Sequence, residues 1–92
     1  MLDLKTTAQY RKDRKQAIKR GLPMELLDAV LQILVEEKPL APKHKDHALF
    51  GNYTGFRECH IRPDWLLVYK IDKGDLILTA SRTGTHADLF KK

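Results

Sequence analysis

The stretch FRECHIRPDWLLVYKIDKGDLILTAS, residues 56–81, decides the fold, because segments with strand character alternate in it with turn sequences. Alternation in the first segment places Phe56, Glu58 and His60 on one face of a strand. The middle segment is almost entirely apolar, which predicts a central strand covered on both faces. The segments and turns are FRECHI (56–61), RPD (62–64), WLLVYKI (65–71), DKGD (72–75) and LILTAS (76–81). We therefore predict three consecutive strands joined by tight turns.

Two helices are predicted before these strands. Thr6 and Gln9 have the spacing of a capping box, which begins a helix, and Gly21 suits its C-terminal end. Pro23 suits the first turn of a second helix, and the two prolines of EKPLAP (37–42) end that helix. Apolar residues recur in the second helix with a period of about 3.6 residues. They are Leu26, Leu27, Val30, Leu31, Ile33, Leu34 and Val35.

Shorter elements complete the predicted order. Alternating Leu2 and Leu4 predict a short opening strand, residues 43–55 have the character of a loop, and ADLF (87–90) predicts a short helix or turn. The order β-α-α-β-β-β plus a tail predicts an α+β fold, in which a helical hairpin packs on a small antiparallel-rich sheet. A length of 92 residues predicts one domain, 1–92.

The chain is basic, with 17 Lys and Arg residues against 12 Asp and Glu and a net charge of +5. This balance favours an acidic partner, such as nucleic acid, an anionic membrane face or an acidic protein, although solubility alone also explains it. The first predicted helix, 7–20, carries a cluster of cations that is either a solvated face or a face turned to phosphates. These cations are Arg11, Lys12, Arg14, Lys15, Lys19 and Arg20.

Cysteine usage and hydropathy fit a cytoplasmic protein. Cys59 is the only cysteine, so there is no internal disulfide framework, and a reducing compartment fits. No apolar run approaches the roughly 20 residues that span a bilayer. The segment MLDLKTTAQY (1–10) has no signal-peptide core. We expect a cytoplasmic location and no membrane partner.

Metal-ligand spacing is weak in this sequence. His44 and His47 form a plausible pair, to which Cys59 or His60 could add. Cys59 and His60 are neighbours on a strand and face opposite sides, so only one of them could join such a site. Neither CxxC nor HExxH occurs. We therefore expect no metal and no cofactor.

A set of polar residues is predicted near the strand ends: His47, His60, Asp64, Arg82 and His86. They converge if strand 76–81 lies beside strand 65–71, and the set then suits metal-free RNA cleavage, in which the ribose 2′-hydroxyl attacks its own phosphate. The protein must supply a base, an acid and a cation for the phosphorane charge. Histidine suits both proton roles, and arginine suits the cation. Trp65 or Phe90 could stack on an unpaired base.

Most of these residues also have a structural interpretation, and the pattern alone leaves both open. The structural alternatives are a hydrogen-bonded sheet histidine for His60, a turn cap for Asp64, a core position for Trp65 and a surface ion pair with Asp75 or Asp88 for Arg82. His86 is the hardest to explain structurally, because it lies in a polar Gly-Thr stretch.

The chain resembles the YafQ branch of the RelE/ParE superfamily of bacterial toxins from toxin–antitoxin pairs. The matching stretches are KDHAL (45–49), GFRECHIRPDWLLVYK (55–70) and RTGTHADLF (82–90), and their order and spacing agree as well. Ala48 departs from the family pattern, in which a proline often follows the histidine. That departure concerns loop stiffness more than chemistry.

The resemblance implies a ribosome-dependent endoribonuclease that cuts mRNA in the ribosomal A site and that a cognate antitoxin protein neutralises. The implied active-site positions are His47, His60, Asp64, Trp65, Arg82, His86 and Phe90. We interpret His86 as the general acid and Arg82 as the ligand of the phosphate. His60, with Asp64, would take the 2′-hydroxyl proton, and His47 would position a group or share a proton role.

Substrate contacts are implied in the same way. Trp65 and Phe90 would shape the site for the base, while helix 7–20 and three lysines would contact ribosomal RNA: Lys43, Lys45 and Lys70. A second class of function fits the charge and fold equally well, namely a non-catalytic basic module that binds RNA or a partner, or a ParE-like gyrase inhibitor. The discriminating feature is the histidine-rich set, which a binding module does not need.

Overall fold

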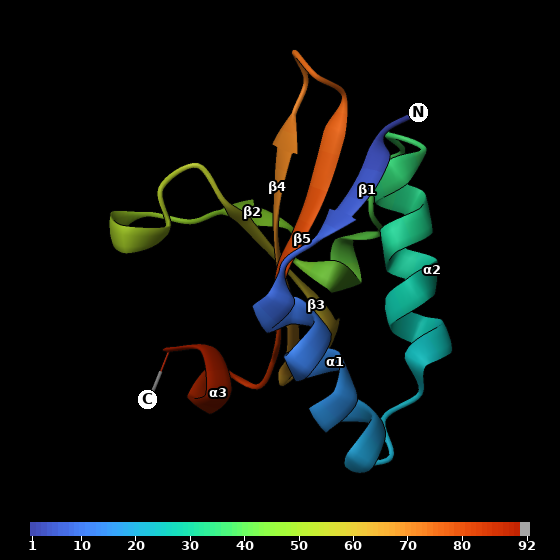
Figure 1. Cartoon of the computed structure of the whole chain (residues 1–92), viewed down its shortest axis with the longest axis vertical. Helices are drawn as coiled ribbons and strands as arrows, with labels where there is room; N and C mark the ends of the chain where they lie inside the picture. Colours follow the sequence, from blue (N-terminus) through green and yellow to red (C-terminus); the bar gives the residue numbers. More distant parts are fainter. Residues whose placement is uncertain (91–92) are drawn as a thin grey trace.

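The computed structural model describes residues 1–90 (Figure 1). The elements follow the chain as β1 (Asp3–Thr6), α1 (Ala8–Lys19), α2 (Met24–Val35), η1 (Pro42–His44), β2 (His47–Ala48), η2 (Gly51–Tyr53), β3 (Arg57–Arg62), β4 (Trp65–Asp72), β5 (Ile77–Gly84) and α3 (His86–Phe90). The predicted α+β fold is confirmed. Short elements between α2 and β3 are added to the predicted order.

The strands form one sheet in the order β1-β5-β4-β3-β2. β1 pairs with β5 in parallel, and the other neighbours are antiparallel. β5 therefore lies between β1 and β4, which explains why its apolar residues are buried. It also runs to Gly84, beyond the predicted end at residue 81, because Arg82, Thr83 and Gly84 still pair with β4.

The first helix begins one residue later than its capping box predicts. Thr7, not Thr6, caps α1, because the Thr7 hydroxyl accepts a hydrogen bond from the Tyr10 backbone N–H at 3.0 Å. The same hydroxyl donates to the carbonyl of Ser81 at 2.8 Å. The choice between adjacent threonines thus depends on β5, which lies far away in the sequence.

Helices α1 and α2 cover one face of the sheet (Figure 1). The core on that face includes Leu27 of α2 with Leu67 and Tyr69 of β4, and Cys59 of β3 is fully buried there. The opposite face carries a smaller apolar cluster, in which Leu89 of α3 packs on β4. The rest of that second face is left to polar residues from β2, β3 and the start of α3.

The segment 43–55 is more structured than a loop. Its two-residue strand β2 pairs with β3, so that His47 lies opposite Glu58. A strand this short leaves no periodic pattern in the sequence, which is why the prediction missed it. The pairing extends the sheet by one strand and brings His47 onto it.

Among residues 1–90, no helix combines the length and the apolar character needed to cross a membrane.

Candidate active site

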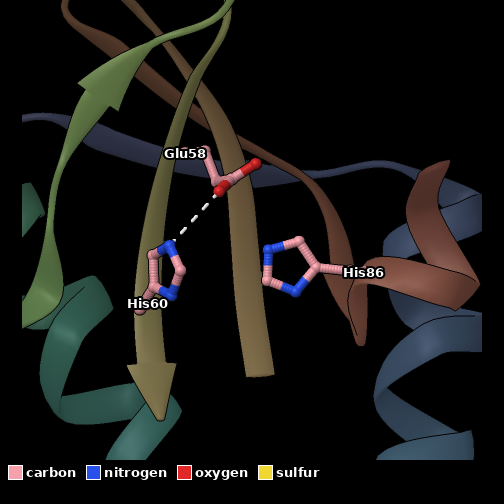
Figure 2. A group of neighbouring side chains, drawn as sticks. All are labelled: Glu58, His60 and His86. Atoms are coloured by element: carbon pink, nitrogen blue, oxygen red, sulfur yellow. Dashed lines mark ion pairs between the residues drawn. The ribbon is translucent and has the colours of Figure 1, made fainter. Parts of the chain in front are cut away.

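The polar part of the second sheet face holds a cluster of two histidines and one carboxylate. One side-chain ligand atom from each of Glu58, His60 and His86 lies within 4.8 Å of the others. Figure 2 shows the carboxylate between the two rings, with His60 and Glu58 on the same strand and His86 reaching in from α3. Three residues separated by up to 28 positions in the sequence thus meet at one point.

Strand geometry explains how the β2–β3 part of the cluster forms. Glu58 and His60 are two residues apart on β3, so their side chains share a face, as predicted. His47 faces the same side because it is the cross-strand partner of Glu58. The Glu58 Oε1 atom is 3.4 Å from His60 Nε2 and 3.7 Å from His47 Nε2.

The Arg-Thr-Gly-Thr-His stretch, residues 82–86, positions His86, the third member of the cluster. Thr85 precedes α3 and forms a reciprocal pair with Asp88: the Thr85 N–H donates to Asp88 Oδ2 at 3.0 Å, and the Asp88 N–H donates to Thr85 Oγ1 at 3.1 Å. This capping box fixes His86 as the first residue of the helix. Its ring centroid lies 5.7 Å from that of His60.

Asp64, in the turn between β3 and β4, holds His86 in place. Its Oδ1 atom lies 2.7 Å from His86 Nδ1 and accepts the His86 backbone N–H at 3.1 Å. These two hydrogen bonds, the side-chain one first, lower the pKa of the Asp64 carboxyl from its ordinary value. Because an acceptor lies at Nδ1, the proton of the neutral ring is on Nδ1. The Nε2 atom then carries no proton and faces the cluster.

In His60 and His47, the Nδ1 atom also lies beside an oxygen acceptor. His60 Nδ1 lies 3.2 Å from the Pro63 carbonyl, and His47 Nδ1 lies 2.6 Å from the Lys45 carbonyl. Carbonyl oxygens only accept, so each Nδ1 donates. The Nε2 atoms of all three rings are therefore left for chemistry, and those of His47 and His60 face Glu58.

Glu58 is the residue that the sequence prediction missed. It is 5% exposed, and the groups that approach its carboxylate are the Nε2 atoms of His60 and His47, at 3.4 and 3.7 Å. A buried carboxylate whose neighbours are histidines is rare, so such a group points to function. The available signal was its position on the same strand face as His60, which the sequence showed but did not distinguish from a solvent-facing glutamate.

The Arg82 guanidinium is bound to a carboxylate of α1 and is not one of the three clustered groups. Its guanidinium binds the Asp13 carboxylate of α1 in a bidentate pair, with Nε–Oδ2 at 2.9 Å and Nη2–Oδ1 at 3.1 Å. This pair raises the pKa of Arg82. Asp13 also accepts the Thr83 N–H at 3.2 Å. The expected surface pairing with Asp75 or Asp88 is wrong, and Arg82 lines a cleft of about 440 Å³ beside α1.

The expected base-binding residues divide into a buried and an exposed group. Trp65 is 2% exposed, and its indole N–H donates to Thr83 Oγ1 at 3.0 Å, so its ring is a core residue with no free face for stacking. Phe90 is partly buried and packs edge-on against Tyr53, with ring centroids 5.4 Å apart. Of the two aromatic residues proposed for the base, Phe90 alone has an accessible surface.

The expected cationic contacts are partly occupied within the protein. On α1, Arg14 pairs with Asp28 at 2.7 Å, and Arg20, the residue that follows α1, pairs with Asp88 at 2.6 Å. Lys45 and Lys70 are exposed, and the Lys70 ammonium lies 5.6 Å from the Phe56 ring centroid. The exposed cations of α1 that remain are Arg11, Lys12, Lys15 and Lys19.

The weak zinc motif considered from the sequence does not assemble as written. His44 Nδ1 donates to the backbone carbonyl of His60 at 2.7 Å. Cys59 is buried in the core on the other sheet face, and burial raises the pKa of its thiol to about 12. The groups that do meet are Glu58, His60 and His86, a different set.

Solved structures with the same fold define the class to which this protein belongs. The Escherichia coli DinJ-YafQ toxin-antitoxin complex contains a chain 42% identical to this one, with a TM-score of 0.88 and 97% coverage of each chain. A metal-bound toxin from Helicobacter pylori is 47% identical, with a TM-score of 0.93 and coverage of 98% of this chain and 100% of that chain. The fold is therefore that of the small RelE-like toxins.

The sequence comparison narrows the class to one family. Residues 2–91 match the family described as bacterial toxin of type II toxin-antitoxin system, YafQ. A relative from Escherichia coli strain K12, named mRNA interferase toxin YafQ, is 43% identical over 89 residues, which are 96% of this chain and 95% of the relative. This chain belongs to the YafQ family of toxins. The predicted family membership is thereby confirmed.

Proposed function

We propose that this chain is a ribosome-dependent endoribonuclease that cuts mRNA in the ribosomal A site by acid–base chemistry. The family and the naming of a 43% identical relative as an mRNA interferase support the substrate class. The observation that carries the proposal is the meeting of His60, Glu58 and His86, with every histidine Nδ1 already bound to an oxygen acceptor.

The proposed reaction needs two proton transfers on opposite sides of one phosphate. His60 Nε2, beside Glu58, takes the proton from the ribose 2′-hydroxyl as this oxygen attacks the adjacent phosphorus. His86, protonated on Nε2 and held through Nδ1 by Asp64, gives a proton to the 5′-oxygen as its bond to phosphorus breaks. The products are a 2′,3′-cyclic phosphate and a 5′-hydroxyl, so atoms and charge balance with no metal in the scheme.

The proposal assigns two roles differently from the interpretation of the sequence. Asp64 belongs with the acid, because it binds His86 rather than His60. Glu58 takes the place beside the base, because it lies 3.4 Å from His60 Nε2. His47, at 3.7 Å from the same carboxylate, supports that pair.

Substrate binding is proposed for groups at the edge of the cluster. Arg82 would hold the phosphate after exchanging Asp13 for it, since a guanidinium fork suits both anions. Phe90 would contact the base, and the exposed lysines Lys45 and Lys70 would contact RNA. Trp65 would not contact the substrate. Its role would be structural, because its indole N–H donates to Thr83 Oγ1 in the core.

We further propose a cognate antitoxin partner and a cytoplasmic location, and that residues 1–92 act as one toxin domain. The partner is supported by the family and by the Escherichia coli complex, in which a YafQ chain is bound to DinJ. The location follows from the substrate, because translating ribosomes are cytoplasmic.

The test is a translation reaction with purified ribosomes and a defined mRNA, comparing the wild type with His86→Gln and with His44→Gln as the matched control. Primer extension maps the breaks. We expect ribosome-dependent cuts that the His86 variant loses by about 10²- to 10⁴-fold and that the His44 variant keeps. Intact mRNA with the wild type would exclude the proposal and favour a non-catalytic binding module or a gyrase inhibitor, which a supercoiling assay separates.

A further inference from the structure

The loop between β2 and β3 exposes an aromatic side chain that the core does not use. Phe50 is 85% exposed, the largest exposed fraction among the large apolar side chains of residues 1–90. It lies outside both apolar clusters, although Leu49, Tyr53 and Phe56 of the same loop pack against the smaller one. Single exposed apolar side chains are common on protein surfaces, so the surroundings of Phe50 decide its role.

The backbone around Phe50 is braced by hydrogen bonds. The Leu49 N–H donates to the Phe56 carbonyl at 3.0 Å, which closes the loop at its base. Within the loop, the Tyr53 N–H donates to the Phe50 carbonyl at 3.3 Å, and the Phe56 N–H donates to the Tyr53 carbonyl at 2.9 Å. The segment with η2 projects to one side of the sheet (Figure 1). A ligand that binds Phe50 therefore has to order one side chain and not a whole loop.

The same loop touches the helix that carries His86. The Tyr53 ring packs edge-on against Phe90 of α3, with ring centroids 5.4 Å apart, and against Phe56, at 6.3 Å. His86 and Phe90 are the first and last residues of α3. The loop of Phe50 is therefore attached to the sheet face that holds the histidine cluster.

The charge beside this loop is positive. Residues 48–56 contain no Asp or Glu. Lys45 precedes the loop and Lys70 lies against its last ring, and both lysines are exposed. Asp46, the acidic residue just before β2, is paired with Arg57 at 3.2 Å. The side chains available to a ligand at this loop are thus cations and an open aromatic ring.

This combination suits single-stranded RNA better than a protein. Proteins that bind unpaired RNA stack its bases on aromatic side chains and bind its phosphates with Lys or Arg. An apolar protein surface would need several adjoining apolar side chains, whereas Phe50 is followed by Gly51 and Asn52, which offer little apolar surface. The surroundings therefore favour a nucleobase as the ligand of Phe50.

We propose that Phe50 stacks on an unpaired base of the RNA substrate. This proposal rests on the proposed function, because RNA is taken as the ligand. Trp65 is buried and Phe90 is half-buried, so Phe50 supplies the open ring that base stacking needs. Every base has a π-face, so the contact strengthens RNA binding without setting a codon preference.

Binding is tested with RNA that cannot be cut, a 2′-O-methyl oligonucleotide, by fluorescence anisotropy at low salt. Phe50→Ala should bind it about 5- to 150-fold more weakly than the wild type, as expected for the loss of one stacked base. Phe50→Trp should keep the affinity, and Phe50→Leu, which is apolar but has no ring, should lose it. Leu76→Ala, at an exposed apolar residue of the β4–β5 turn, is the matched control and should bind as the wild type does. Thermal unfolding confirms that each variant is folded.

Abasic RNA shows whether the contact is made to a base. The oligonucleotide is prepared with one abasic residue at each position in turn, and each version is titrated with the wild type and with Phe50→Ala. At the stacked position we expect the two losses to overlap and not to add, so that this abasic RNA binds both proteins equally. The scan thereby identifies the nucleotide that Phe50 contacts.

Three results would overturn the proposal. Wild-type affinity in Phe50→Ala, or no RNA binding by the wild type, would leave Phe50 to a protein partner. Wild-type affinity in Phe50→Leu would show an apolar contact in place of stacking. Losses that add at every abasic position would exclude a base. The ribosomal cleavage reaction is read separately: RNA binding that depends on Phe50, with no mRNA cleavage by the wild type, would support stacking and refute the proposed function alone.

Discussion

Glu58→Gln is expected to make the protein more stable and less active. Glu58 is almost fully buried and lies between His60 Nε2 at 3.4 Å and His47 Nε2 at 3.7 Å, with no donor for its oxygens among residues 1–90. A glutamine of nearly the same shape removes the buried charge and adds an N–H₂ group that can donate to both rings. Both changes favour the folded state.

The size of the effect follows from those two contacts. A hydrogen bond contributes about 0.5–1.5 kcal/mol net, and both distances must shorten by a few tenths of an ångström before the bonds form. We therefore expect a gain of about 1–2 kcal/mol in the free energy of unfolding. For a chain of this length that gain raises Tm by roughly 4–16 °C. The loss of the carboxylate beside the base should lower mRNA cleavage by about 10²- to 10⁴-fold.

The assay is urea unfolding followed by circular dichroism at pH 8, where an ordinary imidazole is neutral, together with the ribosomal cleavage reaction. Glu25→Gln, in the exposed first turn of α2, is the control: it should lower stability by no more than about 0.3–1 kcal/mol, because it removes a charge that favours the helix dipole, and it should leave cleavage unchanged. A Glu58→Gln protein that is less stable than the wild type would refute the reasoning, because it would show that the carboxylate is satisfied in the folded state.

Three further predictions concern the scaffold around the site. Gly84→Ala should lower stability by about 1–3 kcal/mol and reduce cleavage, because the new Cβ would lie 3.0 Å from the Asp88 side chain that caps α3; unchanged thermal unfolding and activity would argue against this contact. Cys59 is fully buried and its thiol pKa is raised by burial to about 12, so it should react with iodoacetamide at pH 8 only after the protein unfolds, and rapid labelling of the native protein would contradict its position. Arg20 lowers the pKa of Asp88, so this pair stabilises the fold above the ordinary carboxyl range and the contribution is lost as the pH falls below about 4. The wild type should then lose up to about 1 kcal/mol more stability than Arg20→Gln between pH 7 and pH 3, and equal losses in chemical denaturation would show that the pair is inert.

The strand pattern could be predicted because it depends on neighbours in the sequence. The alternation in 56–61 and the apolar run in 65–71 predict which faces are buried, and the structure follows both. His86 also stood out, since a histidine in a polar stretch has no evident structural role. These inferences needed only the pattern of apolar and polar residues among neighbours in the sequence.

The errors arise where a residue's partner is distant in the sequence. Glu58 resembles any solvent-facing strand residue until β2 places His47 opposite it. Arg82 looks free until α1 brings Asp13, 69 positions away, to its guanidinium. Trp65 looked available for stacking because nothing local shows that Thr83 accepts its N–H in the core. Tertiary contacts of this kind leave no local signal.

The place of β5 in the sheet has a consequence for how the toxin is made. β5 is the last strand in sequence, yet it lies between β1 and β4 and pairs with both. Until it is synthesised, the apolar strand β4 keeps an unpaired edge, and β1 has no partner among the described strands. Such edges invite association between chains, and pairing that joins distant segments folds slowly. A chain that terminates before β5 should therefore aggregate and not act as a weak nuclease. In the cell, the protein should become active only after β5 has been synthesised and has paired with β1 and β4.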